Sequence, residues 1–111
     1  RNQPNFQGSR VRNPDAYLLD IRAMNGTDLH TLELQKDDVL DVLFETTKGA
    51  INLEIKGPDG TTLYRGNGRD TTSFTLNIPD SGVYRIMVEA RHAKGTLHIQ
   101  LRHTKEADGA V

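Results

Sequence analysis

Apolar and polar residues alternate along most of this chain, from about residue 16 to residue 103. The clearest stretch is residues 51–56, Ile-Asn-Leu-Glu-Ile-Lys, in which every second side chain is aliphatic. Because side chains on a β-strand point to opposite faces in turn, this pattern predicts strands with one buried and one solvated face. Turn residues interrupt the pattern at intervals of about 8–12 residues, which is typical of antiparallel sandwiches and barrels.

The alternation predicts about eight short strands. We expect them over residues 16–24, 29–34, 39–45, 51–55, 61–65, 74–78, 84–90 and 97–101. Turns are expected at Asn25-Gly26, residues 36–38, residues 47–49, residues 57–60, residues 66–70, residues 79–82 and Lys94-Gly95. Since each strand has one apolar face, the fold class is all-β: an antiparallel two-sheet sandwich, jelly-roll-like, with its sheets about 10 Å apart.

The length of 111 residues suits one domain. Residues 1–14 are polar, contain two prolines and show no period, so we interpret them as a flexible N-terminal tether. The alternative is an edge strand around Phe6 or Val11. The sandwich domain is expected over residues 15–104, and a polar tail over residues 105–111.

Composition excludes several classes of function. The net charge of −1, from 14 basic and 15 acidic residues, gives no electrostatic basis for binding nucleic acid or an anionic membrane. No apolar run approaches the ~20 residues that span a bilayer. The absence of cysteine excludes disulfides, thiolate metal sites and a cysteine nucleophile. The chain starts at Arg1 rather than Met, which we interpret as removal of a leader or a tag.

Residues 49–101 carry a family resemblance. They contain a Pro-Asp-Gly turn followed by a run of the form F-x-L-x-I-P-x-x-G-x-Y-x-I-x-V, which is expected to form a hairpin. Its positions are held by Phe74, Leu76, Ile78, Pro79, Gly82, Tyr84, Ile86 and Val88. The segment resembles bacterial pre-peptidase C-terminal (PPC-like) sandwich domains. The Lys94-Gly95 turn and the strand with His98 are also similar to small cell-surface lipoproteins of Gram-positive gut bacteria.

This resemblance implies an exported bacterial protein, extracellular or on the cell surface, whose membrane attachment is a lipidated cysteine upstream of Arg1. The acidic calcium ligands of some PPC-type domains have no counterpart in the sequence.

The polar residues offer no catalytic or metal-binding constellation. A zinc site needs three or four converging ligands, whereas His98 and His103, five positions apart, face opposite sides of a regular strand. Aspartates in the expected turns could supply calcium oxygens, but their spacing follows no regular binding loop, and aspartate is a common turn residue. No serine stands in a nucleophile elbow. We therefore predict no metal ligands, no cofactor, no catalytic residues and no enzyme activity.

Long polar side chains on the solvated side of the last two expected strands are the candidate ligand-binding residues, because they can hydrogen-bond a sugar or a peptide. They are Arg85, Glu89, His98, Gln100 and Arg102. The alternative interpretation is cross-strand salt bridging and protection of sheet edges against aggregation.

The sequence thus favours a non-catalytic exported module that binds a glycan, a peptide or a surface protein, or serves as a spacer. The alternative is a calcium-stabilised accessory domain of a secreted hydrolase.

Overall fold

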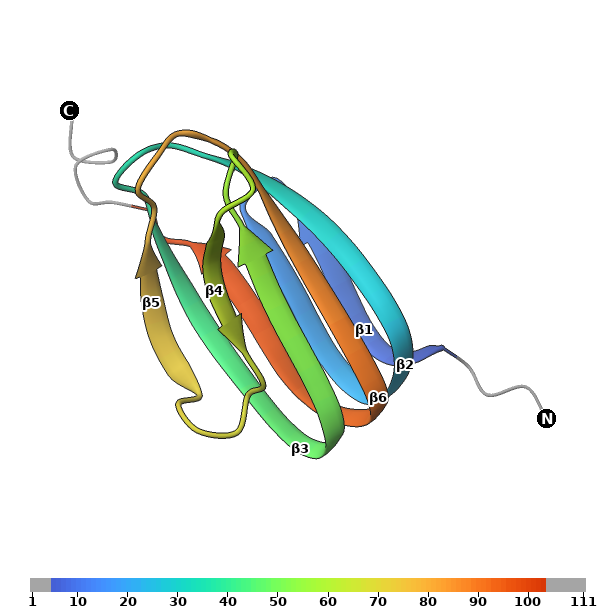
Figure 1. Cartoon of the computed structure of the whole chain (residues 1–111). Coiled ribbons are helices and arrows are strands. Elements are labelled where there is room, and N and C mark those ends of the chain that lie inside the picture. The colour runs from blue at the N-terminus through green and yellow to red at the C-terminus, as the bar shows by residue number, and fades with distance from the viewer. Residues whose placement is uncertain (1–4, 104–111) are drawn as a thin grey trace.

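The computed structural model describes residues 5–103, and this part of the chain is all-β and antiparallel, without a helix. Its strands, shown in Figure 1, are β1 (Phe6–Asn13), β2 (Ala16–Leu34), β3 (Val39–Lys56), β4 (Thr62–Gly66), β5 (Ser73–Asn77) and β6 (Gly82–Leu101). They form one six-stranded sheet in the order β1-β2-β6-β3-β4, and β5 pairs with the N-terminal part of β3. The predicted all-β class is confirmed.

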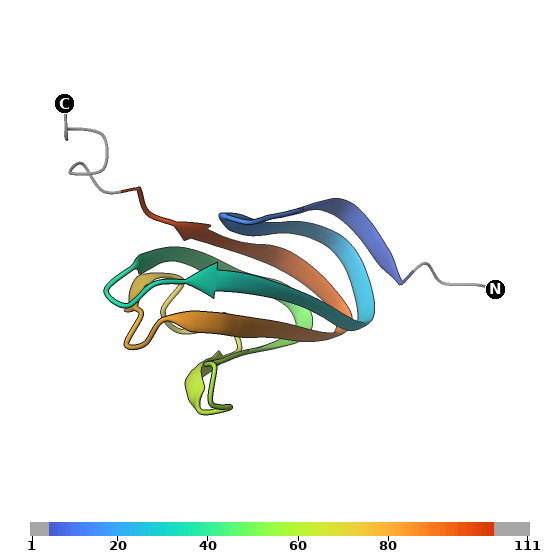
Figure 2. The same ribbon diagram turned by 90° about the horizontal axis from the view of Figure 1, so that it is seen from above.

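Three very long strands organise the sheet. The strands β2, β3 and β6 contain 19, 18 and 20 residues, against a usual length of about 5–6 residues. The pairing register shifts near the middle of each, between Ile21 and Gly26 in β2 and between Thr46 and Ala50 in β3. Because such bulges bend a strand, the sheet folds over on itself at this level, as Figure 2 shows.

The fold divides the sheet into two halves that face each other. The first half-sheet contains β1, residues 16–21 of β2, residues 39–46 of β3, β5 and residues 95–101 of β6. The second half-sheet contains residues 26–34 of β2, residues 50–56 of β3, β4 and residues 82–90 of β6.

Eight separate strands in two sheets were therefore the wrong description: one folded sheet of six strands is present. The turns expected at Asn25-Gly26, residues 47–49 and Lys94-Gly95 are bulged bends through which the same strands continue with the same neighbours. Glycine at a positive φ, as at Gly49 (68°), occurs both in sharp bends within a strand and in hairpin turns. The presence of glycine in the sequence therefore does not distinguish a bend from a turn. The turn predicted at residues 57–60 is confirmed by the hydrogen bond from the amide of Gly60 to the carbonyl of Gly57, 3.0 Å.

The hairpin predicted from Phe74 to Val88 is also wrong. The strand β5 pairs with β3, whereas the following part of β6 pairs with β2 and with the other half of β3. The amide of Ile78 donates to the carbonyl of Asp38, 2.9 Å, so β3 holds this connection at the first half-sheet. Residues 79–81 then carry the chain across to the second half-sheet.

Residues 6–13, which we expected to belong to a flexible tether, form the edge strand β1. The tether prediction is wrong for these residues, and the alternative of an edge strand around Phe6 or Val11 is confirmed. The alternation of apolar and polar residues does not predict this strand, because almost all of its side chains are exposed. Backbone pairing with β2, from Phe6 opposite Met24 to Asn13 opposite Ala16, holds it in place. Residues 1–4 of the tether and the tail at residues 105–111 lie outside the described residues, and the domain boundaries stay a prediction.

One core lies between the halves and takes side chains from both. Its largest fully buried members include Tyr17 and Phe44 from the first half-sheet and Tyr84 from the second. At about 1.5–3 kcal/mol for each buried large apolar side chain, this interior is the main favourable term in folding. The alternation predicted most of it, except that Met24 rather than Ala23 is buried where β2 bends.

Candidate functional site

The five predicted ligand-binding residues lie on two surfaces rather than one. Arg85 and Glu89 point outward from the second half-sheet, whereas His98 and Gln100 point outward from the first, followed by Arg102 just after β6. Because β6 bends over between these two groups, its outward side chains come to opposite outer faces of the molecule. The structure therefore does not bring the five residues together.

On the first half-sheet, much of the predicted charge is paired across strands. The Arg102 guanidinium donates to both carboxylate oxygens of Asp41, at 2.5 and 3.1 Å, and this pairing holds the pKa of Asp41 below its usual range. The Nε2 atom of His98 lies 3.0 Å from Oδ1 of Asp20. These contacts fit the alternative interpretation of cross-strand pairing. Exposed Val11 and Leu43 lie on the same outer face as His98.

The outer face of the second half-sheet has a different character. An open groove of about 880 Å³ runs over residues 29–31 of β2, the end of β3, the turn at Pro58 and the start of β6. Leu29 and Val83 line it with 60% and 49% of their surfaces exposed. Met87 lies directly opposite Leu29 in the pairing register. We call this surface, lined by Leu29, Val83, Met87 and Pro58 around Arg85, the aliphatic groove.

Charged side chains stand in and beside the aliphatic groove. Arg85 lies between Thr31 on β2 and Lys56 on β3, and no hydrogen bond or ion pair within residues 5–103 engages its guanidinium. Glu54 accepts hydrogen bonds from Arg65 and from the hydroxyl of Thr62, each at 2.8 Å, and these contacts lower the pKa of its carboxyl group. Aliphatic side chains around a cation that no described residue pairs, with a paired carboxylate nearby, suit a contact with another macromolecule.

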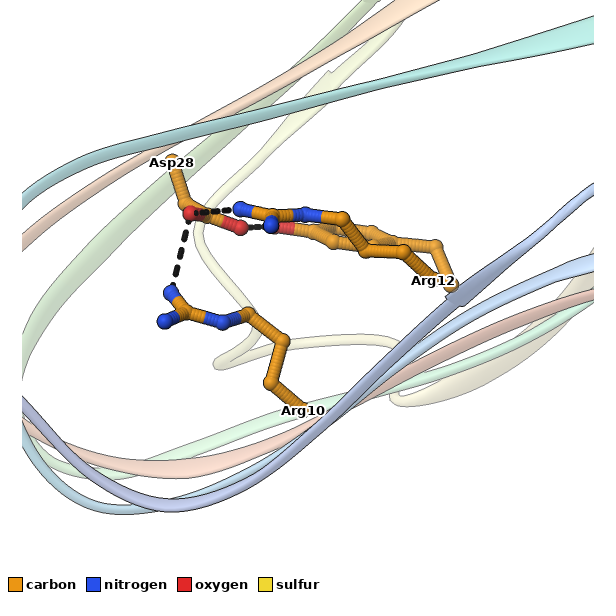
Figure 3. A network of polar contacts seen from close by, with 4 residues as sticks. Arg10, Arg12 and Asp28 are labelled. Carbon is orange, nitrogen blue, oxygen red and sulfur yellow. Dashed lines mark hydrogen bonds and ion pairs between the residues drawn. The ribbon is translucent and has the colours of Figure 1, made fainter.

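A second polar cluster, which we did not predict, lies between the half-sheets at the open side of the fold. Asp28, 8% exposed, accepts hydrogen bonds on Oδ1 from Arg10 at 3.0 Å and from Arg12 at 2.5 Å (Figure 3). Its other oxygen accepts a hydrogen bond from the buried hydroxyl of Tyr17. Burial and the neighbouring carboxylate raise the pKa of Tyr17 well above that of a free phenol. The ring of His30 stacks on Tyr17 with 5.0 Å between centroids.

This Asp28 cluster joins β1 to a part of β2 with which β1 does not pair. The carboxylate comes from the second half-sheet, while both guanidiniums and the phenol come from the first. The sequence could have indicated this cluster. Asp28, His30 and Leu32 are two positions apart, so they face the same side of the strand, and Leu32 was predicted to face inward. The polar character of Asp28 hid that signal.

No group of three or more His, Cys, Asp or Glu side chains that could hold a metal ion occurs within residues 5–103. The described part of the chain also has no helix with the length and apolar character needed to cross a membrane.

Comparisons with known proteins bear on the fold. No protein-family model matches the sequence, and no curated protein matches it. The structure is similar to that of PliG from Aeromonas hydrophila, a periplasmic lysozyme inhibitor of g-type lysozyme, with a TM-score of 0.57 and 16% identity over 80% of this chain and 88% of that one. A weaker likeness, with a TM-score of 0.38 and 10% identity, relates 93% of this chain to 99% of a chain from accessory secretory protein 1, 2 and 3 of Streptococcus pneumoniae. This β-rich fold is thus shared with a protein that acts by inhibiting an enzyme.

Proposed function

We propose that this chain is a non-catalytic, exported module that binds another protein through the aliphatic groove. The observation that carries the proposal is that one groove on the outer face of a paired sheet contains exposed Leu29 beside Met87 on one side of Arg85 and exposed Val83 on the other. Several exposed aliphatic side chains gathered in one groove with charged neighbours are typical of protein contact surfaces, and a single exposed leucine is not.

A protein partner fits this groove better than a glycan. Within the described residues, the lining of the groove contains His30 but no Phe, Tyr or Trp side chain, so it offers no broad aromatic face on which a sugar ring could stack. Arg85 in the middle of the groove supplies a cation for a carboxylate or a carbonyl oxygen of the partner.

The similarity to the PliG structure supports export and gives the first protein to test. Purified g-type lysozyme would be titrated against the wild-type chain by calorimetry, and inhibition of its cell-wall lysis would be followed in parallel. We expect binding that Leu29→Glu and Val83→Glu each weaken at least about tenfold, because a charge replaces apolar contact area at the interface.

Val11→Glu is the matched control, since Val11 is an exposed aliphatic residue on the opposite outer face. If lysozyme does not bind, envelope and culture proteins of a producing bacterium would be captured on immobilised wild-type chain and on the same three variants. Capture that survives Leu29→Glu and Val83→Glu but fails with Val11→Glu would contradict the groove as the binding surface.

Several expectations from the sequence belong to the same proposal. We keep the PPC-type resemblance, a jelly-roll-like relation and attachment to the cell surface through a lipid anchor as parts of it. The calcium-stabilised accessory domain is the competing proposal, and a melting curve with and without a chelator separates the two. A bound ion must stabilise the folded state by mass action, so a lower midpoint in chelator would favour the calcium alternative.

A further inference from the structure

Within the described residues, no strand pairs with one of the two edges of residues 26–34 of β2. They pair with residues 82–90 of β6 on one side. On the other side β1 follows β2 only as far as Met24, and the amide of Asn25 donates to the carbonyl of Asn5. Within residues 5–103 no backbone hydrogen bond reaches this side of residues 26–34. Because the N–H and C=O groups of successive residues point alternately to the two sides of a strand, about half of these nine residues direct their backbone donors and acceptors toward a further strand.

An excess of positive charge lies over the inner side of this edge, whereas Glu33 lies on its outward side. Arg10 and Arg12 reach from β1 to Asp28, so two guanidiniums share one carboxylate. Their side chains are 35% and 43% exposed, and within the described residues each has one hydrogen bond to a side-chain or backbone acceptor. Since a guanidinium carries five N–H donors, most of the donors at this edge can serve a further acceptor.

The outward side of the same edge carries one exposed apolar side chain, Leu29, among Thr27, Thr31 and Glu33. Leu29, next in sequence to Asp28, points to the opposite face and is 60% exposed. A strand added beside residues 26–34 would place alternate side chains next to Arg10 and Arg12 on its inner side and next to Leu29 on its outer side.

We infer that this edge binds an extended peptide in which acidic and apolar residues alternate. The peptide backbone continues the second half-sheet, its carboxylates take the spare N–H donors of Arg10 and Arg12, and its apolar side chains cover Leu29. Charge complementarity selects this occupant over a second copy of the chain. A second copy paired through the same edge would bring its own two arginines and add to the positive charge.

The inference concerns the edge of the second half-sheet, whereas the proposed function concerns its outer face. Leu29 borders both surfaces, and Val83 belongs to the groove alone, so Val83 variants show which of the two proposals fails. The probe is a capped, fluorescently labelled peptide of about eight residues that alternates Glu and Val, long enough to pair along most of the edge. Binding would be measured by anisotropy and located by amide hydrogen exchange. We expect added protection of amides within residues 26–34.

Three comparisons make the test specific. A Gln-Val peptide of the same length should bind at least about tenfold more weakly, because its contacts to the arginines lose the charge. Two further Glu-Val peptides would carry N-methyl groups on alternate backbone nitrogens, one on its Glu residues and the other on its Val residues. The peptide whose methylated nitrogens are the ones that pair with the edge should not bind. Val83→Glu, which lies in the aliphatic groove and on β6, should leave peptide binding unchanged.

Arg10→Gln with Arg12→Gln should weaken binding of the Glu-Val peptide to the level of the Gln-Val peptide. Because this variant also removes partners of Asp28, its folding is checked first by circular dichroism. If it does not fold, the comparison of the peptides on the wild-type chain still tests the inference. Equal affinity of the two peptides, absence of binding, or protection located at β1, β4 or β5 would each overturn the inference.

Discussion

Tyr17 and Asp28 lie eleven positions apart on the single strand β2, yet the hydroxyl of Tyr17 donates a hydrogen bond to Oδ2 of Asp28. Two residues at this separation on a straight strand would be about 36 Å apart. The contact exists because β2 bends between Ile21 and Gly26 and its two ends come to opposite half-sheets. This bond therefore depends on the same bend that closes the core.

The first prediction concerns the Asp28 cluster. Asp28→Asn leaves two guanidiniums without their carboxylate and should lower the free energy of unfolding by about 1–3 kcal/mol. Chemical denaturation of the two proteins measures the difference. The control is Asp20→Asn, which removes the exposed contact to His98 and should cost less than about 1 kcal/mol. Equal costs for the two variants would mean that the cluster does not stabilise the closed sheet.

The second prediction concerns alkaline pH. The raised pKa of Tyr17 in the folded chain means that the folded state holds this proton more tightly than the unfolded state does. Its contribution is complete below the phenol pKa of the unfolded chain, about 10, and is lost as pH rises above that value. Tyr17→Phe should therefore be less stable than the wild type at pH 7 but lose less stability between about pH 10 and 12. Melting temperatures across this range test it, and parallel curves would contradict it.

Much of the interior could be predicted from the alternation of residue types. Burial of Leu32 and Leu34 follows from their spacing of two, because they alternate with the polar residues Thr31 and Glu33, which belong to the exposed face. The position of β1 could not be predicted in this way. Its side chains are exposed, and its stability comes from pairing with β2 and from the contacts of Arg10 and Arg12, which depend on a distant residue.

The topology was also beyond the sequence pattern. A glycine with a positive φ is compatible with a hairpin turn and with a bulge, and the difference depends on which strand the following residues meet. The bend at Gly49 illustrates this, since residues on both of its sides pair with β6. The spread of Arg85 and His98 to opposite faces follows directly from the corresponding bend in β6, so the candidate site could not be assembled before the bends were known.

The third prediction tests whether the bend in β3 is tightly packed. A Cβ atom at Gly49 would lie 2.1 Å from the carbonyl oxygen of His92, on top of a positive φ of 68°. Gly49→Ala should lower the free energy of unfolding by about 2 kcal/mol or more, because the backbone of β6 would have to move.

The control for this substitution is Gly60→Ala. Gly60 has a similar φ of 86°, and a Cβ atom there meets nothing within 4 Å, so the variant should show the conformational cost alone, about 1 kcal/mol. Denaturation curves of the two variants separate the clash from the strain. If Gly60→Ala proves as destabilising as Gly49→Ala, close contact between β3 and β6 at the bend is not what requires glycine.

The last prediction concerns acid pH and distinguishes two kinds of carboxylate contact. Hydrogen bonds from Arg65 and Thr62 lower the pKa of Glu54, and the backbone amide of Thr61 lowers that of Asp59. Since both values are depressed in the folded state, their contributions are present above the unfolded values, about 4.3 and 3.9, and are lost as pH falls through the folded values. Glu54→Gln and Asp59→Asn should therefore each reduce the loss of melting temperature between about pH 5 and pH 2.

Salt distinguishes the contact of Glu54 from that of Asp59, because about 1 M NaCl screens the ion pair of Glu54 with Arg65 far more than the local backbone hydrogen bond of Asp59. The difference between Glu54→Gln and the wild type should shrink in salt while that of Asp59→Asn persists, and an identical salt response would show that the Arg65 charge does not stabilise the Glu54 carboxylate.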